Sequence, residues 1–175
     1  MANRTWRCVR NYLQHHGVSC ELLFNQQKSK ANLLATIGPA DVPGIVLSGH
    51  TDVVPVDGQR WSVAPFELSE KDGNLYGRGT ADMKGYIACV LASVPALVQA
   101  PLCMPVHIAL FYDEEVGCLG VRSLIEAFHA KPVKPLLCLI GKRRNSSRCW
   151  ATRANWRCAA KCMARRAIRP MRRRV

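Results

Sequence analysis

Three short, uninterrupted apolar runs constrain the fold of this chain more than any other feature. They are "GIVLSGH" (44–50), "VHIALFYDEE" (106–115) and "PLLCLIG" (135–141). Continuous apolar runs of this length are typical of strands that are buried on both faces of a sheet. Helical spacing of apolar residues occupies 83–100 and 118–130, between the runs. Buried strands that alternate with helices predict an α/β three-layer sandwich around a largely parallel, mixed sheet.

Shorter signals complete this prediction. Pro95 lies inside the segment 83–100, so we expect that helix to be kinked or split. The remaining elements follow from apolar spacing and turn residues: a helix over 6–16, strands over 18–24 and 31–38, and a loop over 51–82 with a hairpin at 67–79.

The charge of the chain is confined to its last part. The formal net charge is +13, yet residues 1–141 hold equal numbers of basic and acidic side chains. Residues 142–175 hold 13 Lys and Arg and no Asp or Glu. The imbalance therefore says nothing about the α/β part, and we treat 1–141 and 142–175 as separate regions.

Composition argues against several protein classes. No run of about 18 apolar residues is present, so no transmembrane helix and no membrane partner is expected. The first residues are basic but lack the apolar core of a secretory signal, so a cytoplasmic location is expected. In that compartment the nine cysteines are expected to be reduced thiols, mostly small core residues.

Polar clusters stand next to the predicted elements. "SGHTDVVP" follows the first apolar run, "GRGTADMKG" precedes the long helix, and "FYDEEVG" ends the second run. Ligands of open α/β sheets gather outside the carboxyl ends of the strands, which is where two of these clusters lie. The loop 51–82 can bring the third cluster to the same place.

The side chains of these clusters suit a metal site. His50 can supply a neutral imidazole nitrogen, and Asp52 is spaced to orient that ring. Asp82 can bridge two ions, while Glu114 and Glu115 would point in opposite directions if the strand persists. Two Zn²⁺ ions would polarise an amide carbonyl and lower the pKa of a water between them. Each residue alone could equally be an ordinary surface or core side chain, so the prediction depends on their joint position.

These motifs also resemble a known family. "LSGHTDVVPVDGQRWSVAPFELSEKDGNLYGRGTADMKG" and "YDEEVGCLG" resemble the zinc-dependent aminoacylase and peptidase family, over roughly residues 5–141. The resemblance implies a zinc-peptidase/phosphorylase-like catalytic domain, of which 1–141 is the N-terminal part. "GTADMKGYIACVLA" and "YDEEVGCLGVRSLI" are most similar to members that deacetylate N2-acetylornithine, giving ornithine and acetate for arginine biosynthesis. Desuccinylases and other acyl-amino-acid or peptide hydrolases of the family are the alternative.

The resemblance implies a role for each site residue. His50 would bind the first metal, Asp82 would bridge both metals, and Glu115 would bind the second. Glu114 would be the general base, taking a proton from the attacking water and passing it to the leaving amine, and Asp52 would support His50. The cofactor would be two Zn²⁺ ions, although His and carboxylate ligands also suit Co²⁺ or Mn²⁺.

The chain departs from the family directly after Gly141. The family continues with a Gly-Glu-Pro-Thr type motif that carries a metal ligand, whereas Lys142 follows here. The family also has a lid and dimerisation domain, which would make the complete enzyme a homodimer. That domain and the last metal-binding histidine are absent from 142–175. We therefore expect an incomplete site and an inactive fragment.

A shifted reading frame accounts for this departure. Codons read one base out of register after Gly141, with the free bases chosen to fit, permit an acidic residue, a GHKG turn and an HSAYAP stretch like those of the family. We hypothesise that 142–175 is an out-of-frame, disordered segment, produced by mutation or sequencing error.

The rival interpretation of 142–175 is a nucleic-acid-binding arm. Its basic side chains would contact phosphates, and Trp150 and Trp156 would stack on bases. Its cysteines, at positions 149, 158 and 162, lack the spacing of a zinc finger. A basic run of this kind is more often a solvated or disordered segment, so nucleic acid is not the expected partner. A third interpretation is a catalytically dead chain that retains only the fold.

Overall fold

The computed structural model of the chain describes residues 2–141. The hypotheses about 142–175, namely an out-of-frame disordered segment or a nucleic-acid arm, lie outside the described residues. The elements follow in this order: α1 (Ala2–His15), β1 (Cys20–Phe24), β2 (Ala31–Ile37), β3 (Ile45–His50), β4 (Ser69–Lys71), β5 (Asn74–Tyr76), η1 (Thr80–Lys84), α2 (Gly85–Gln99), β6 (Val106–Phe111), α3 (Val121–Ala130) and β7 (Leu137–Ile140).

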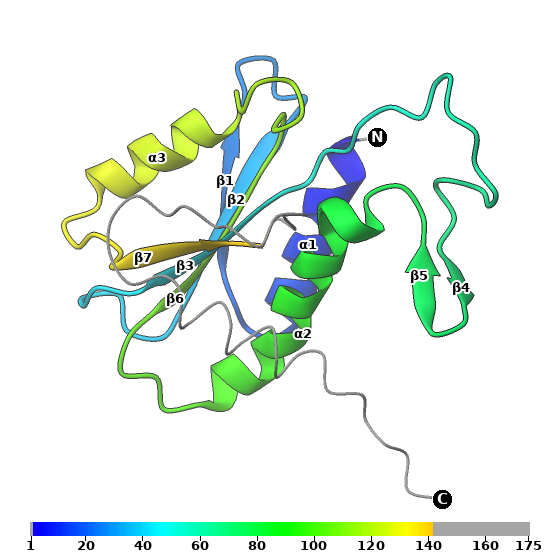
Figure 1. Ribbon diagram of the computed structural model, residues 1–175. Coiled ribbons are helices and arrows are strands. Elements are labelled where there is room, and N and C mark those ends of the chain that lie inside the picture. Colours follow the sequence, from blue (N-terminus) through cyan, green and yellow to red (C-terminus); the bar gives the residue numbers. More distant parts are fainter. Residues whose placement is uncertain (1, 142–175) are drawn as a thin grey trace, which may run out of the picture. The chain divides into compact units, whose positions relative to one another are not determined.

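Five strands form one mixed sheet in the order β1-β2-β6-β3-β7, and β4 pairs with β5 in the predicted hairpin. Strands β6, β3 and β7 are parallel, while β2 is antiparallel to both β1 and β6. Four of the five strands therefore run in one direction (Figure 1). This arrangement confirms the predicted mixed sheet with mostly parallel strands.

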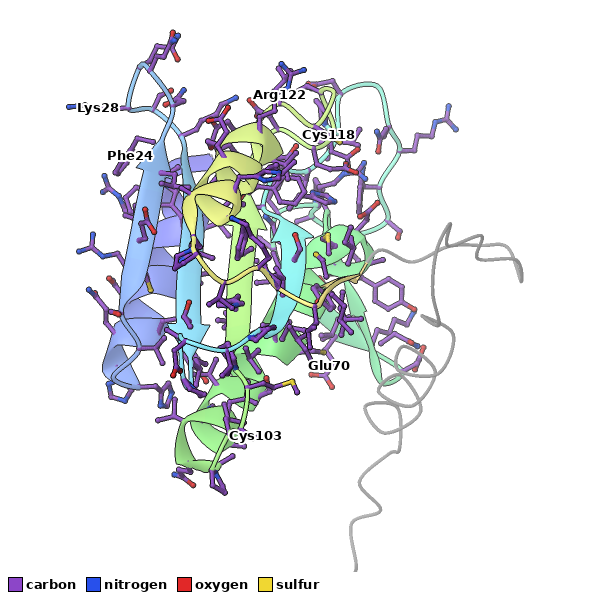
Figure 2. All side chains as sticks on the ribbon, turned by 90° about the vertical axis from the view of Figure 1, so that its left-hand side faces the viewer. Phe24, Lys28, Glu70, Cys103, Cys118 and Arg122 are labelled. Atoms are coloured by element: carbon purple, nitrogen blue, oxygen red, sulfur yellow. The ribbon has the colours of Figure 1, made fainter. Side chains whose placement is uncertain are left out.

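Helices cover both faces of the sheet, because alternate side chains of a strand point to opposite faces. On β2, Leu33, Ala35 and Ile37 belong to a core with the buried residues of α1 and α2. Leu34, between them, belongs to a second core with Leu124 of α3. Figure 2 shows α3 in front of the sheet, with α1 and α2 behind it. The three layers follow directly from this alternation.

Two predicted strands differ from the observed ones. The strand predicted over 106–115 ends at Phe111, because Asp113 has a left-handed backbone with φ 56° and cannot continue a strand. The strand predicted over 135–141 is not buried on both faces. As β7 it lies at the edge of the sheet, and 65% of Ile140 is exposed.

Pro95 does not split the helix predicted over 83–100. Helix α2 runs continuously from Gly85 to Gln99 with Pro95 inside it. Proline removes its own hydrogen bond to the carbonyl four residues earlier, and its ring crowds that carbonyl. Val90 and Val94 are buried in the core beside the sheet, so packing holds the helix together across this point.

One compositional expectation needs correction. Among the described residues all cysteines are free, but most are exposed rather than part of the core; Cys103 and Cys118 lie at opposite ends of the sheet (Figure 2).

In the same part of the chain one helical segment, Thr80–Gln99, is long and apolar enough to cross a membrane by length and composition. Its Ile87, like Val94, packs into the core beside the sheet, and a core helix passes the same test.

Candidate metal centre

The carboxyl ends of two neighbouring parallel strands, β3 and β6, bring the polar clusters "SGHTDVVP" and "FYDEEVG" together. His50, the last residue of β3, pairs with Phe111, the last residue of β6. Beyond that pair, the Thr51 N–H donates to the Phe111 carbonyl oxygen at 2.8 Å. The two segments that carry Asp52 and Glu114 therefore leave the sheet side by side, as the sequence predicts.

His50 is the centre of the cluster. Its side chain is 1% exposed, and both ring nitrogens face carboxylates. Nε2 lies 3.0 Å from Asp82 Oδ1 and 3.9 Å from Glu114 Oε2. Nδ1 lies 3.2 Å from the backbone oxygen of Asp52 and 3.4 Å from its Oδ1. One nitrogen thus faces the acidic groups while the other is held by Asp52.

Asp82 reaches His50 from the turn η1, at the start of α2. Asp82 and Met83 have non-helical backbone angles, and the peptide bond between them is cis. Met83 is fully buried below the site, and its sulfur accepts the His50 backbone N–H at 3.3 Å. The Asp82 side chain is 44% exposed, so the cluster opens to solvent on the Asp82 side.

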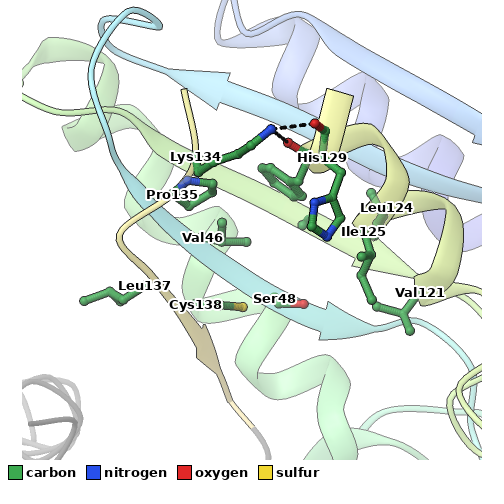
Figure 3. A pocket seen from close by; sticks show the side chains of 12 residues that line it. Val46, Ser48, Val121, Leu124, Ile125, His129, Lys134, Pro135, Leu137 and Cys138 are labelled. Atoms are coloured by element: carbon green, nitrogen blue, oxygen red, sulfur yellow. Dashed lines mark hydrogen bonds between the residues drawn. The ribbon is translucent and has the colours of Figure 1, made fainter. Parts of the chain in front are cut away.

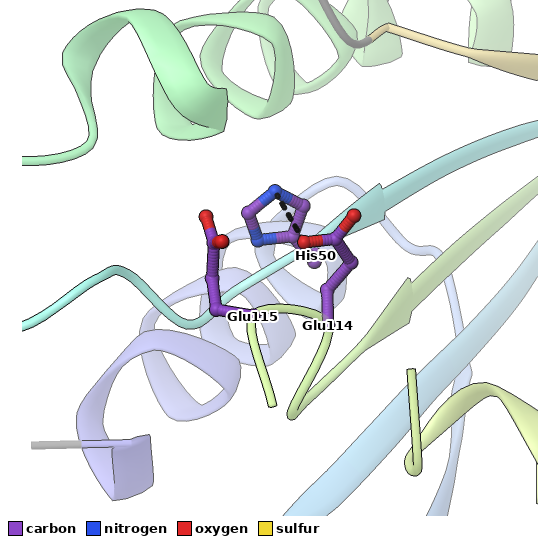
Figure 4. Close-up of side chains that lie close together, drawn as sticks. All are labelled: His50, Glu114 and Glu115. Carbon is purple, nitrogen blue, oxygen red and sulfur yellow. Dashed lines mark ion pairs between the residues drawn. The ribbon is translucent and has the colours of Figure 1, made fainter. Parts of the chain in front are cut away.

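Glu114 and Glu115 do not point in opposite directions. The expected divergence required the strand to continue, and β6 ends at Phe111. In the following turn one oxygen of each glutamate and one nitrogen of His50 lie within 4.8 Å of one another. Figure 4 shows the two glutamates on either side of the imidazole. The structure thus brings all five predicted site residues together.

Asp52 links the two loops. Its Oδ2 accepts the Glu115 backbone N–H at 3.0 Å. Its Oδ1 is buried without a well-aligned hydrogen bond, and His50 Nδ1 at 3.4 Å is its ion-pair partner. Burial raises the pKa of Asp52, but the interaction with His50 and the N–H groups of Glu115 and Glu114 outweigh burial and lower it to about 2. Asp52 is therefore ionised wherever the protein is folded at ordinary pH.

The electrostatics of His50 follow from the same contacts. Burial lowers the pKa of the imidazole, but hydrogen bonds to Asp52 and Asp82, together with the charge of Glu114, outweigh burial and raise it above its usual value. Without a metal this site therefore favours a proton on His50. A metal cation would compete with that proton for the same imidazole.

The donor set fits a transition-metal ion. One imidazole nitrogen and several carboxylate oxygens are the ligands that Zn²⁺, Co²⁺ and Mn²⁺ accept. The support of His50 Nδ1 by Asp52 is the arrangement that orients metal-binding histidines. The geometry does not separate the roles of Glu114 and Glu115, because both lie within the same 4.8 Å cluster with His50.

The sequence did not point to Lys84 and Asn32, which connect the loops around the site through hydrogen bonds but are not among the candidate ligands. Lys84 donates from Nζ to the Thr51 backbone oxygen at 2.7 Å and so ties the start of α2 to the loop after β3. Burial lowers the pKa of Lys84 below its usual value, and the opposing effect of the Asp52 charge only partly offsets burial. Asn32 is fully buried in β2 and contacts the loop that carries the two glutamates. An amide side chain in the run "ANLLATI", in which Thr36 is the other polar residue, was the signal that could have revealed Asn32.

A groove elsewhere in the described part of the chain lacks this chemistry. A groove of about 390 Å³ lies between α3 and the strands β3 and β7 (Figure 3). Its walls are mostly apolar, with Leu124 and Phe128 from α3 and Leu137 from β7. None of the five predicted site residues lines it, so the candidate site is the cluster around His50.

Comparison with protein families decides what kind of protein carries this cluster. Residues 46–153 match the model of peptidase family M20/M25/M40, which is more than half of the chain. The chain belongs to this family. The match includes all five residues of the cluster. By ancestry the chain is thus a hydrolase whose relatives use metal.

Curated relatives agree with this assignment. The chain is 43% identical over 133 residues to an acetylornithine deacetylase of Pasteurella multocida, which covers 75% of this chain and 35% of that protein. It is 42% identical over 113 residues to an acetylornithine deacetylase of Proteus mirabilis, covering 64% and 29%. The chain therefore spans about a third of the length of these relatives.

Solved structures share the fold. A crystal structure of human carnosine dipeptidase 1 superposes with a TM-score of 0.67 at 27% identity, covering 80% of this chain and 32% of that one. The M20 family metallo-carboxypeptidase Sso-CP2 from Sulfolobus solfataricus gives a TM-score of 0.69 at 23% identity, with the same coverage. Residues 2–141 therefore have the architecture of the N-terminal part of such a catalytic domain.

Proposed function

We propose that this chain is the N-terminal part of a metal-dependent amidohydrolase that removes the acetyl group from N2-acetylornithine, giving ornithine and acetate. The convergence of His50, Glu114 and Glu115 within 4.8 Å, with Asp82 on the imidazole, carries the proposal of a metal-dependent reaction. The names of the curated relatives, at 38–43% identity, support the choice of substrate.

Each residue of the cluster has a task in this reaction. His50, Asp82 and Glu115 would hold the metal ions, which when bound polarise the amide carbonyl and lower the pKa of a water. Glu114 would take the proton of the attacking water and deliver it to the leaving amine. Asp52 would keep His50 Nδ1 engaged, so that Nε2 faces the site. Zn²⁺ is the proposed ion, with Co²⁺ as a functional substitute.

The metal site is tested by titrating the full chain with Zn²⁺ in a calorimeter. We expect a single ion to bind, and more weakly than in a complete site, because we propose that the site in this chain is incomplete. Glu115→Gln and His50→Ala should abolish the binding signal. Glu126→Gln, an exposed acid on α3, and His15→Ala, at the end of α1, are the matched controls that should leave it unchanged.

The possible results separate the interpretations. Binding that survives in both His50→Ala and Glu115→Gln would mean that the metal binds elsewhere. Tight binding of two ions to the wild-type chain would contradict the proposal that the site is incomplete. Absence of any binding would favour a chain that retains only the fold.

The substrate and the fragment character are tested through the gene. Sequencing across codon 141 should reveal a family-like reading frame in the downstream DNA, and we propose that the present chain hydrolyses little or no substrate. The protein made from the restored frame should deacetylate N2-acetylornithine faster than it desuccinylates N-succinyl-diaminopimelate or cleaves dipeptides. The opposite preference would favour the alternative, a desuccinylase or dipeptidase of the same family.

The remaining properties of the complete enzyme are also proposals. We propose a cytoplasmic homodimer without a nucleic-acid partner. Fractionation of cells that express the restored frame, followed by size-exclusion chromatography with light scattering, tests both the location and the oligomeric state.

A further inference from the structure

The loop between β6 and α3 carries both glutamates of the cluster and has little regular structure of its own. Its two ends meet closely, since a Cβ atom on Gly120 would lie 2.1 Å from the Tyr112 carbonyl oxygen. Asp113 and Cys118 have left-handed backbones, with φ 56° and 55°, which non-glycine residues adopt at a cost. Such a loop keeps one conformation only if its surroundings hold it.

Asn32 is placed to hold both ends of this loop. It is 0% exposed, in β2, next to the end of β6. Its Oδ1 accepts the Tyr112 backbone N–H at 3.2 Å, where the loop begins. Its Nδ2 donates to the Gly120 carbonyl oxygen at 2.6 Å and to Ser123 Oγ at 2.8 Å, where α3 begins.

An asparagine suits this position for a chemical reason. The three contacts use one acceptor and two donors, which is the pattern of a primary amide. Aspartate would place an acceptor against the Gly120 carbonyl oxygen, and leucine would leave buried backbone groups unpaired.

Lys30 holds the same loop at a second point. It directly precedes β2, and its Nζ lies 2.7 Å and 2.6 Å from the two carboxylate oxygens of Asp113. Asp113 is the residue with φ 56° that immediately precedes Glu114. The Lys30 ammonium also lies 5.9 Å from the centre of the Tyr112 ring. The turn between β1 and β2, marked by Lys28 in Figure 2, lies at the same end of the sheet as Cys118.

We propose that Asn32 and Lys30 are positioning residues of the metal centre. They fix the loop 112–120 so that the side chains of Glu114 and Glu115 face His50 before a metal arrives. This inference rests on the proposed function, because it assigns the two residues to the metal site described above.

The test compares variants of the full chain by two measurements. The first is Co²⁺ affinity by calorimetry, with the visible absorption of Co²⁺ as a report of ligand geometry. Loss of groups that orient metal ligands commonly weakens binding by about 10- to 100-fold. We expect Asn32→Leu to fall in this range and Lys30→Met near its lower end, whereas Lys30→Arg should retain binding.

Two matched controls separate positioning from general stability. Lys28→Met removes an equal charge from the same turn. Thr36→Val removes a partly buried side-chain hydrogen bond, to His107 at 2.9 Å, from the far end of β2. Both controls should bind Co²⁺ like the wild type. If Asn32→Leu does not fold, the comparison of Co²⁺ affinity between Lys30→Met and Lys28→Met decides whether the loop contacts position the metal ligands.

The second measurement is hydrogen exchange in the metal-free protein. The Glu115 N–H bonds to Asp52, and the Leu119 N–H bonds to the Asp113 carbonyl oxygen. Both amides should exchange faster in Lys30→Met and Asn32→Leu than in the controls. If the wild type binds no Co²⁺, the metal assignment fails while exchange still tests whether the loop is held. The inference would be overturned if both amides exchanged at the wild-type rate in Lys30→Met and Asn32→Leu. It would also be overturned if Lys30→Met bound Co²⁺ with wild-type affinity.

Discussion

Replacing Asp52 by asparagine should remove a measurable part of the stability of the metal-free protein. Asn is the neutral isostere of a protonated carboxyl group, so the substitution isolates the effect of the charge. The pKa of Asp52 is lowered from 3.8 to about 2 in the folded protein. Each pKa unit corresponds to about 1.4 kcal/mol, so the ionised form contributes about 2.5 kcal/mol near neutral pH.

The pH dependence has a definite sign. Because the folded pKa is below the unfolded one, this contribution is fully present above about pH 4 and is lost as the pH falls towards 2. The difference in unfolding free energy between wild type and Asp52→Asn should therefore be about 2.5 kcal/mol at neutral pH and should shrink in acid. The substitution also removes a charge that raises the pKa of His50, so that pKa should fall.

Urea denaturation followed by circular dichroism, in buffers with a chelator, measures this difference. Asp57→Asn, an exposed residue of the same loop, is the control and should change stability by less than about 0.5 kcal/mol. A difference for Asp52→Asn that is no larger than the control, or one that stays constant from neutral pH into acid, would refute the electrostatic account.

Further predictions concern His50 and the core. The pKa of His50 is raised in the folded protein, so the protonated imidazole stabilises the fold below about pH 6.5. This contribution is lost as the pH rises through the folded pKa. The urea midpoint of chelator-treated protein should therefore fall over this pH window. The Zn²⁺ affinity measured by calorimetry should increase over the same pH window as the proton leaves His50. If the urea midpoint and the Zn²⁺ affinity changed in the same direction with pH, this competition would be contradicted. Leu13→Ala should cost about 2–5 kcal/mol in urea denaturation because Leu13 is fully buried, whereas Leu75→Ala, 56% exposed, should cost much less.

The sequence was most informative where local chemistry and chain order determine position. The apolar runs predicted the strands β3 and β6, and the polar residues that follow them predicted the cluster. The strand pattern predicted that both strands are parallel and end at the same edge of the sheet, and the structure shows that they are neighbours, so that His50 and Glu114 meet. The joint position of the polar clusters thus carried more information than any single residue.

Other features could not be predicted because they depend on neighbours distant in the sequence. The edge position of β7 follows from sheet order, which leaves Ile140 65% exposed despite its apolar run. The continuity of α2 through Pro95 depends on its packing against the sheet. The convergence of Glu114 and Glu115 depends on a left-handed turn at Asp113, which a local pattern of strand residues does not reveal.

The sequence by itself determined the α/β class, the set of candidate site residues and the neutral charge of residues 1–141, because these depend on residue type and order. Only the tertiary structure decided how the site is held. Lys30 bonds to Asp113, 83 positions away, and Asn32 bonds to Gly120, 88 positions away. Such contacts exist only once β2 lies beside β6, because side-chain hydrogen bonds require distances of about 3 Å that sequence spacing does not encode.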